Sequence, residues 1–472
     1  MKIIKEKQSK SKIKVSVLIS TFNKENYIGD TLDSILTQSM NLQDIELIVV
    51  DDCSTDNTIN IVSEKIGKFL NYKLVQLDEN SGTPGKPRNL SIDLSRGKYL
   101  MFIDGDDWLP TDSIETLYSL LRKNKTDYAA GLTKYFHNDR LARAGVILSK
   151  IPYSKTHFRY FRKAFYHLAP AGRMVKSNII KKNDIRFPEM IFGEDLQFFA
   201  EVFFNTKKIS TTNKVVYYAN RYTDNVSLVR SKESTTLNRM KLQHNAYIHL
   251  AKSYKNDSGF ANLLYRIINK DILEAKFYKK DFIKNIDDLL PVLQNVLEDI
   301  EKDFDPLKYV DDELNKQAIK LIIKGNKEEV IKFVKFYLNK DEESIHTLNG
   351  YTYYLYNGIL YKKNLHVTLS KIIEKENKVY LKLDSKNSDI KYLEIKNFKD
   401  PTDYKILKLK SNPFKKGEYS VQFQSDNLQK GKWLLRALDK DYNSGVIKSS
   451  KQFGFYDTVN GNLGFKKEKS KS

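Results

Sequence analysis

The sequence predicts an α/β protein with a mostly parallel central sheet, followed by a helical region and a C-terminal β-sandwich. Short apolar runs alternate with segments whose apolar residues recur at helical spacing, and this alternation predicts the parallel sheet. A change near residue 350 to short alternating runs rich in tyrosine predicts the sandwich. At 472 residues the chain exceeds what one hydrophobic core usually serves, so we expect two or three domains.

The first elements follow one another in a βαβ order. Residues 1–12 are polar and rich in lysine, and we expect them to be a loose end before a first strand at 15–19. Apolar residues at helical spacing predict a helix over 27–38, and a second begins near Ser54-Thr55-Asp56, which supply N-cap candidates. Further strands are expected at 46–50, 73–77 and 98–103.

The rest of the chain divides by pattern. Gly193-Glu194-Asp195 stands ahead of the apolar run 196–204, so these acids are expected to open a helix. Residues 234–339 have helical periodicity, and Asn357-Gly358 is a hairpin-turn signal. The predicted parts are a catalytic domain at 1–230, a helical bundle or linker at 231–348, a β-sandwich at 349–466 and a disordered basic tail at 467–472.

The net charge of +21 is uneven along the chain. Residues 351–472 hold 25 Lys and Arg against 13 Asp and Glu, a balance of +12. Such a surface attracts nucleic acid, an anionic membrane face or a phosphate-linked polymer, although a solvated surface without a partner has the same composition. The single cysteine, Cys53, excludes an internal disulfide, and the absence of Cys/His clusters excludes a zinc site. The apolar runs are too short to cross a bilayer and no signal-peptide pattern opens the chain, so we expect a cytoplasmic protein.

The most informative feature is a group of three carboxylates. Asp104, Asp106 and Asp107 directly follow the apolar run 99–103, so a buried strand is expected to end in them. Oxygen ligands at this spacing suit Mg²⁺ or Mn²⁺, and such an ion neutralises a diphosphate whose bond is breaking. The alternative is an acidic turn after a strand. The motif points to chemistry on a nucleotide diphosphate.

Polar motifs follow two other predicted strands as well. Thr21-Phe22-Asn23 follows the first and Asp51-Asp52 the second. Ligands of open parallel sheets bind beyond the C-terminal ends of the strands. We therefore expect these motifs and Asp104 to Asp107 to meet at one crevice.

In order and spacing, the segments 15–23, 49–56 and 102–107 resemble those of family 2 glycosyltransferases. The segments 80–89 and 193–197 are similar to those of bacterial wall teichoic acid glycosyltransferases of the TarS and TarP kind, a resemblance that covers about the first 230 residues. It implies a GT-A nucleotide-diphosphosugar transferase domain, a UDP-sugar donor with GlcNAc favoured, inversion at the anomeric carbon, and Mn²⁺ or Mg²⁺ as cofactor.

The resemblance also implies roles for residues of the nucleotide site. Asp52 would accept the uracil N3–H, although a turn acid, as expected of Asp56, is the structural alternative. Thr21 and Phe22 would hold uracil and ribose. In the stiff loop 80–89, Asn80 and Arg88 are further binding candidates, the latter through its planar, multi-donor head.

The remaining roles concern the diphosphate and the chemistry. Asp104 would hydrogen-bond the ribose or uridine side of the donor, and Asp106 would ligate the metal. Asp107 would orient these two aspartates. Asp195 would be the general base and Glu194 would hold sugar hydroxyls, whereas the structural alternative is that both acids only favour a helix N-terminus.

A loop at 219–227 resembles the one that closes over the diphosphate in the teichoic acid enzymes. In it, Arg221 and Ser227 would contact phosphate. Asn225 stands where the family often has His, which puts the metal preference in doubt.

The C-terminal part has two interpretations. Its tyrosines could stack on sugars, but alternating tyrosines are typical of half-buried strands; they are Tyr351, Tyr353, Tyr354, Tyr356 and Tyr361. Its lysines would concentrate a teichoic acid acceptor near the active site. The resemblance implies a trimer formed through this domain, and the basic surface suits peripheral association with the inner membrane face. There are two alternative functions. One is a transferase for capsule or another surface polysaccharide, and the other is a non-catalytic protein that binds anionic glycans. No RNA-binding signature accompanies the lysines, so we expect no nucleic-acid partner.

Overall fold

The computed structural model divides into two compact units, Met1–Leu263 and Leu264–Ser472. It describes residues 1–137, 141–144, 152–222, 235–310, 312–339, 345–348, 351–362, 367–375, 378–385, 389–397, 400, 403–424, 428, 431–439, 444–448, 455–457 and 463–467. No helix within these ranges is both long and apolar enough to cross a bilayer.

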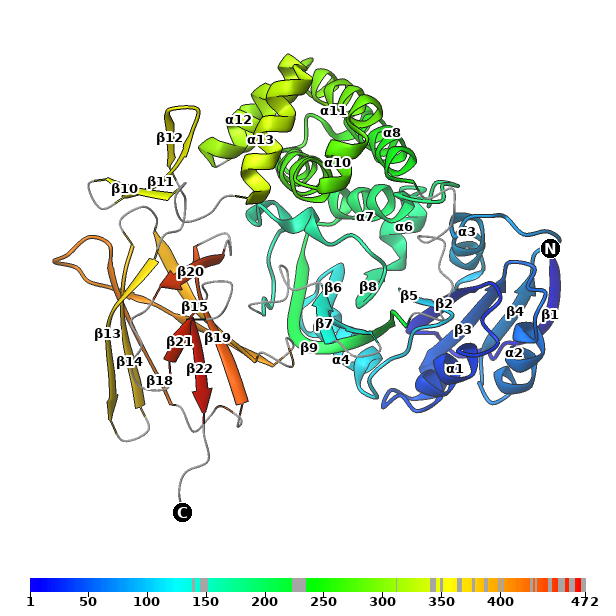
Figure 1. Ribbon diagram of the computed structural model, residues 1–472. Coiled ribbons are helices and arrows are strands. Elements are labelled where there is room, and N and C mark those ends of the chain that lie inside the picture. Colours follow the sequence, from blue (N-terminus) through cyan, green and yellow to red (C-terminus); the bar gives the residue numbers. More distant parts are fainter. Residues whose placement is uncertain are drawn as a thin grey trace. The chain divides into compact units, whose positions relative to one another are not determined.

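The first unit is built on one large mixed sheet with the order β1-β4-β3-β2-β5-β8-β6-β7, in which β9 also pairs with β6 (Figure 1). The four central strands β4, β3, β2 and β5 are mutually parallel, as the sequence predicts. The strands are β1 (Lys2–Lys7), β2 (Val15–Thr21), β3 (Ile45–Asp51), β4 (Tyr72–Gln76), β5 (Tyr99–Asp104), β6 (Tyr128–Phe136), β7 (Leu141–Ala144), β8 (Arg173–Lys176) and β9 (Ile209–Asn220).

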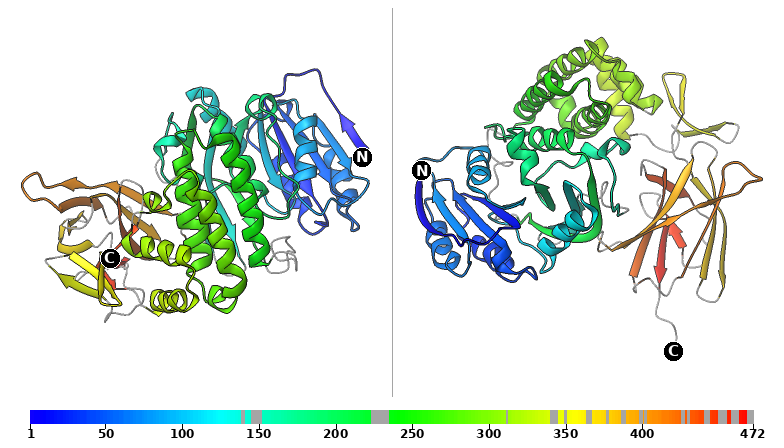
Figure 2. Two further views of the ribbon diagram at one scale, coloured as in Figure 1. Left: turned by 90° about the horizontal axis from the view of Figure 1, so that it is seen from above. Right: turned by 180° about the vertical axis from the view of Figure 1, so that it is seen from behind.

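Helices cover both faces of the parallel strands, which is why those strands are apolar almost throughout. Val15, Val17 and Ile19 of β2 pack with α1 (Ile28–Leu36), α2 (Thr58–Ile66) and α4 (Ser113–Asn124) on one face. On the other face Phe102 of β5 packs edge-on against Phe187, Phe198 and Phe199. The latter two phenylalanines belong to α7 (Glu194–Asn205), and α3 (Gly85–Leu94) contacts β2 and β3. The right-hand view of Figure 2 shows the strands side by side from behind.

The N-terminus differs from the prediction. Residues 2–7 are not loose, because β1 pairs antiparallel with β4 at the edge of the sheet. Its sequence, Lys-Ile-Ile-Lys-Glu-Lys, has the charged side chains that edge strands commonly carry. The polar composition that suggested a loose end therefore reflects an edge position.

The helices expected over 234–339 are present. In the first unit α8 (Thr236–Tyr254) contacts α7, and the Tyr254 ring stacks on Phe204 at 4.5 Å between centroids. Beyond α9 (Phe260–Arg266) come a π-helical segment (Ile267–Phe277), α10 (Lys280–Lys284), α11 (Ile286–Glu301), α12 (Glu313–Lys324) and α13 (Lys327–Asn339). Asp312 is the N-cap residue of α12, where its carboxylate accepts from two backbone N–H groups, and Gly325 follows the helix in the left-handed conformation (φ 72°).

The second unit also contains the predicted β-sandwich. Its sheet order is β16-β15-β19-β20-β13-β14-β18-β17, with β22 beside β19 and β21 beside β22. Inward residues such as Leu381, Leu393 and Trp433 form one apolar core. The strands are β13 (Val367–Lys375), β14 (Lys378–Asp384), β15 (Ile390–Asn397), β16 (Tyr404–Lys408), β17 (Lys410–Ser411), β18 (Glu418–Gln424), β19 (Gly431–Asp439), β20 (Ser444–Lys448), β21 (Phe455–Asp457) and β22 (Leu463–Lys467).

A small three-stranded meander precedes the sandwich, formed by β10 (Ile345–Leu348), β11 (Tyr351–Tyr356) and β12 (Ile359–Lys362). Asn357 and Gly358 join its last two strands with φ of 47° and 74°, which is the hairpin turn that the sequence predicts. Tyr354 and Tyr361 are buried, and Tyr356 packs against two phenylalanines of α13. These three tyrosines fit the structural interpretation rather than sugar stacking.

Candidate active site

Three predicted motifs meet at one edge of the sheet. Strand pairing places Thr21 opposite Asp51 and Ser20 opposite Asp104. The backbone N–H of Asp52 donates to the carbonyl of Thr21 at 2.8 Å. The C-terminal ends of β2, β3 and β5 therefore form a single crevice, as expected for an open parallel sheet.

Asp52 is buried and is held by the loop 80–89. Its carboxylate accepts from the N–H and the hydroxyl of Ser81, both at 2.9 Å, and from the Asn80 amide at 3.3 Å. Burial raises the pKa of Asp52, while the Ser81 hydrogen bonds oppose this. Asn80 also donates to the Asp52 carbonyl at 3.0 Å, so its side chain positions Asp52. Asp56 is the expected turn acid, since it accepts from the Thr58 N–H.

Gly82 and Gly85 lie in the loop 80–89. Gly85 approaches the protein's own backbone, because a Cβ there would lie 2.7 Å from the Pro188 carbonyl oxygen. Gly82 has a positive φ of 70° that permits the turn beside Asn80. These glycines shape the loop that holds Asp52.

Two buried hydroxyls at this edge have no hydrogen-bond partner within the described ranges. They belong to Thr21, at the end of β2, and Thr83, in the loop that holds Asp52. A buried polar atom without a partner costs free energy, so such atoms mark places where a ligand can complete the bonding. Phe22, the next residue after Thr21, is 39% exposed and offers an aromatic ring to the same region.

The side chain of Arg88 joins the two ends of the site. From α3 its guanidinium donates to Asp104 at 2.9 Å and to Asp195 at 2.9 Å, and it also contacts Glu194 at 3.2 Å. It lies over the Phe187 ring, 5.2 Å from its centroid, and is only 7% exposed. Asp104 at the end of β5 and Asp195 at the start of α7 therefore lie in one site.

The two acids of α7 have different surroundings. The Asp195 side chain is 29% exposed and that of Glu194 only 10%. Burial raises the pKa of Asp195 well above its usual range and the neighbouring Glu194 charge adds to this, while Arg88 lowers it. Burial also raises the pKa of Glu194 against the effect of Arg88. A carboxylate with a raised pKa that remains accessible can take a proton near neutral pH.

The other acids of the motif have separate partners. Asp106 forms an ion pair with Lys24 at 2.9 Å. Asp107 is buried and accepts from the Tyr217 hydroxyl at 2.8 Å and from the Asn220 N–H at 2.7 Å. Burial and the charges of Asp106 and Asp104 raise its pKa well above the usual range. Asp107 thus anchors the acidic loop to β9.

Within the described ranges, no three His, Cys, Asp or Glu side chains are arranged to hold a metal ion by themselves. Magnesium is often bound by only one or two carboxylates together with substrate phosphates. Asp104 and Asp106, two residues apart at the end of β5, are the carboxylates that could serve in this way, although in the structure Asp104 accepts from Arg88 and Asp106 pairs with Lys24.

Arg221 follows β9 at the same edge. Its guanidinium donates to the Asn220 carbonyl at 2.7 Å and lies 5.0 Å from the Tyr135 ring centroid. Burial lowers its pKa, but the charges of Asp107, Asp104 and Asp106 outweigh this and raise it. The guanidinium therefore lies in the field of the acidic motif. Ser227 and Asn225 lie outside the described residues.

Three side chains of the site were not singled out from the sequence. Lys24 stands one residue beyond the motif 21–23, and that position was the available signal. Tyr217 lies in the apolar run 215–218, and nothing local in the sequence distinguishes it from a core residue. Arg173, whose charge lowers the pKa of Asp195, carries no local signal, because only the folded chain brings its guanidinium to α7, where it lies 5.2 Å from the Phe199 ring centroid.

Residues 16–183 match the family model described as glycosyl transferase family 2. The chain is 31% identical over 220 residues to poly(ribitol-phosphate) beta-N-acetylglucosaminyltransferase TarS of Staphylococcus aureus, covering 44% of this chain and 36% of TarS. It is 31% identical over 208 residues to a poly(ribitol-phosphate) beta-glucosyltransferase of Bacillus spizizenii, covering 44% and 32%. TarP of Staphylococcus aureus, another poly(ribitol-phosphate) beta-N-acetylglucosaminyltransferase, is 32% identical over 221 residues, covering 43% and 62%.

The solved structure of S. aureus TarS superposes with a TM-score of 0.60 at 18% identity and covers 96% of this chain and 85% of that one. A structure of TarS 1–349 with UDP-GlcNAc gives a TM-score of 0.59 at 22% identity, covering 75% and 100%. These likenesses confirm the predicted fold. The chain carries a glycosyltransferase family 2 domain. Its matched region spans about a third of the length of the first two curated relatives.

Proposed function

We propose that the chain transfers a sugar, GlcNAc in the first instance, from a UDP-sugar to a hydroxyl of a poly(ribitol phosphate)-type wall teichoic acid, with inversion at the anomeric carbon. The observation that carries this proposal is the pair of 2.9 Å contacts from Arg88 to Asp104 and to Asp195. They bring the acid proposed for the donor side and the acid proposed as base into one site. All three relatives are named as poly(ribitol-phosphate) transferases, which supports poly(ribitol phosphate) as the acceptor. Two are named for GlcNAc and one for glucose, so both donor sugars have to be compared.

In the proposed reaction the acceptor hydroxyl oxygen bonds to the anomeric carbon as the bond from that carbon to the UDP oxygen breaks. Asp195 takes the hydroxyl proton, and UDP leaves with the electron pair. Attack from the face opposite UDP gives inversion. The raised pKa of Asp195 supports this role, because a base is most effective when its pKa lies near the working pH.

Donor binding is proposed to use the strand ends. Asp52, held rigidly by Ser81, would accept the uracil N3–H, since a carboxylate can accept more bonds than the loop provides. The Thr21 hydroxyl and the Phe22 ring would complete the nucleoside pocket. Arg221 and, in the same loop, Ser227 would contact the diphosphate.

A divalent ion, Mn²⁺ or Mg²⁺, would be held by Asp106 with Asp104 beside it, and when bound it neutralises charge on the leaving diphosphate. Lys24 pairs with Asp106 in the structure and would have to give way or share that carboxylate. Turnover lost with EDTA and restored by Mn²⁺ or Mg²⁺ would support this cofactor, and full activity in EDTA would exclude it.

The decisive experiment supplies UDP-GlcNAc or UDP-glucose with polyribitol phosphate and measures labelled polymer. Labelled polymer supports the proposal, and none with either donor rejects the teichoic acid assignment. Labelling of a capsular polysaccharide instead would favour the surface-polysaccharide alternative. A protein that binds the polymer but never releases UDP would be the non-catalytic alternative.

The proposed trimer, formed through the C-terminal domain, has its own test. Light scattering of the protein as it elutes from a size-exclusion column should give three times the mass of one chain. A measured mass equal to one chain would exclude the trimer.

A further inference from the structure

The β-sandwich presents a basic sheet face to solvent. On β14, Val379, Leu381 and Leu383 point into the core, so the alternate residues Tyr380 and Lys382 point outward. The same alternation on β18 buries Val421 and Phe423 and exposes Ser420, Gln422 and Gln424.

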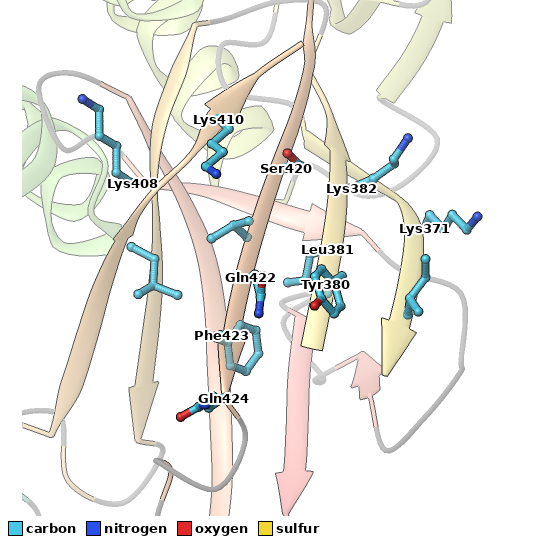
Figure 3. Close-up of a pocket in the computed structure, with 13 residues that line it drawn as sticks. Lys371, Tyr380, Leu381, Lys382, Lys408, Lys410, Ser420, Gln422, Phe423 and Gln424 are labelled. Atoms are coloured by element: carbon cyan, nitrogen blue, oxygen red, sulfur yellow. The ribbon is translucent and has the colours of Figure 1, made fainter. Parts of the chain in front are cut away.

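Strand register arranges the outward residues in rows. Lys371 of β13 lies opposite Lys382 of β14, Lys382 opposite Ser420 of β18, and Ser420 opposite Lys410 of β17. Residues directly opposite each other in antiparallel strands share a face, so these four side chains form one transverse line, here called the lysine row. Four strands place its ends about 14 Å apart. Figure 3 shows Lys410, Ser420, Lys382 and Lys371 following one another in that order.

The next row is suited to a polyol. It consists of Ile373, Tyr380 and Gln422, which are opposite one another in the register. Tyr380 is 38% exposed and offers a ring face with a hydroxyl, and Gln422 offers an amide (Figure 3). Both rows line an open hollow of about 770 Å³, to which Lys408 also contributes.

The charges of this face are weakly neutralised. Lys382 lies 3.7 Å from Glu418, but that carboxylate also accepts from Asn412 at 2.7 Å and pairs with Lys415 at 3.2 Å. Among the residues that the structure describes, no carboxylate forms an ion pair with Lys371 or Lys410. The row therefore presents net positive charge to solvent, with Lys371 and Lys382 on adjacent strands and Lys410 two strands beyond Lys382.

We propose that the lysine row and the adjoining Tyr380 and Gln422 form a docking site for a run of the poly(alditol phosphate) acceptor. Successive phosphates would meet the lysines, and the polyol between them would meet the tyrosine ring and the amide. A single exposed ring does not provide the series of stacking platforms that single-stranded nucleic acid uses. This inference rests on the proposed function and adds to it an acceptor site outside the catalytic crevice.

The test compares two triple variants of the full chain. Lys371→Gln/Lys382→Gln/Lys410→Gln removes the row, and Lys391→Gln/Lys405→Gln/Lys432→Gln removes the same charge from β15, β16 and β19. Binding of fluorescent polyribitol phosphate is measured at low salt beside binding of one ribitol phosphate unit. The row variant should bind the polymer about tenfold more weakly than wild type, because three charge contacts are lost, and the other variant should match wild type.

Equal polymer affinity in the row variant, or an equal loss in both variants, would overturn the docking site. Row-dependent binding of single-stranded DNA or anionic vesicles as tight as that of the polymer would also overturn it. Tyr380→Ala gives a second test, since it leaves every charge in place and should weaken binding of the polymer but not of inorganic phosphate. Labelling of the polymer by wild type is scored separately, so a failed docking site is distinct from a failed proposed function.

Discussion

The two units use charge in opposite ways. In the first, Arg88 is 7% exposed and contacts three carboxylates that lie on β5 and α7. In the second, Lys371, Lys382 and Lys410 are exposed on strands that carry few neutralising acids on that face. Buried, paired charges fix geometry and shift pKa values, whereas exposed charges attract a polyanion at long range without fixing it. The comparison suggests that chemistry and acceptor capture can be disrupted separately.

Asp195→Asn should have the largest effect. The amide keeps the shape of the side chain but cannot take the hydroxyl proton, so transfer should fall by about a thousandfold. Initial rates of labelled polymer formation measure this. Glu201→Gln, on the same helix but bonded to His249, is the matched control and should retain near wild-type transfer. Retained transfer in Asp195→Asn would reject the assigned base.

Arg88→Gln should have the next largest effect, a fall of about a hundredfold in the rate of transfer. Removal of the buried guanidinium leaves the charges of its carboxylate partners uncompensated. The sign of its pH effect is specific. Arg88 lowers the pKa of Asp195, so its removal raises that pKa further, and the acid limb of the kcat/KM profile should move to higher pH. An unmoved limb would mean that Asp195 is not the group whose deprotonation limits transfer.

Stability should depend on the same groups. Burial raises the pKa values of Asp195 and Glu194, so the folded state retains protons that the unfolded state has already released. Their contribution to the free energy of unfolding is therefore fully present below the unfolded-state pKa and is lost as the pH rises through the folded-state pKa values. Urea unfolding of Arg88→Gln between pH 4 and 8 should show a steeper loss of stability with pH than wild type, about a few kcal/mol in total. A parallel pair of curves would contradict this coupling.

Much of the fold was predictable because its signals are local. Buried parallel strands are short apolar runs, and the motifs 21–23, 51–52 and 104–107 follow them directly. The Arg88 contacts were not predictable, since the contact with Asp195 joins side chains of α3 and α7 that are 107 positions apart in the sequence. Strand β1 was missed because an edge strand can be polar. The lysine row was not predictable either, because its alignment depends on the register of four strands.

Salt should affect ligand binding by the two units differently. Raising the ionic strength to 0.5 M shortens the Debye length to a few ångströms, so the exposed lysines should lose most of their attraction for the polymer. We expect the KM for polyribitol phosphate to rise about tenfold, while the KM for the UDP-sugar changes less. An equal rise in both constants would contradict the difference drawn between the units.

Thr21→Val should have the smallest effect. The Thr21 hydroxyl has no partner among the described residues, so its removal should leave stability unchanged or slightly improved. If the hydroxyl bonds the nucleotide, UDP should bind about fivefold more weakly, which corresponds to about 1 kcal/mol. Calorimetric titration with UDP, beside thermal melting without it, gives both numbers. Unchanged UDP affinity would remove Thr21 from the nucleoside pocket.

The most direct test of the central claim is a crystal structure of Asp195→Asn with intact UDP-GlcNAc. The account predicts the diphosphate beside Asp104 and Asp106, with the anomeric carbon facing residue 195. A donor bound away from those two aspartates, or an anomeric carbon turned from residue 195, would contradict it.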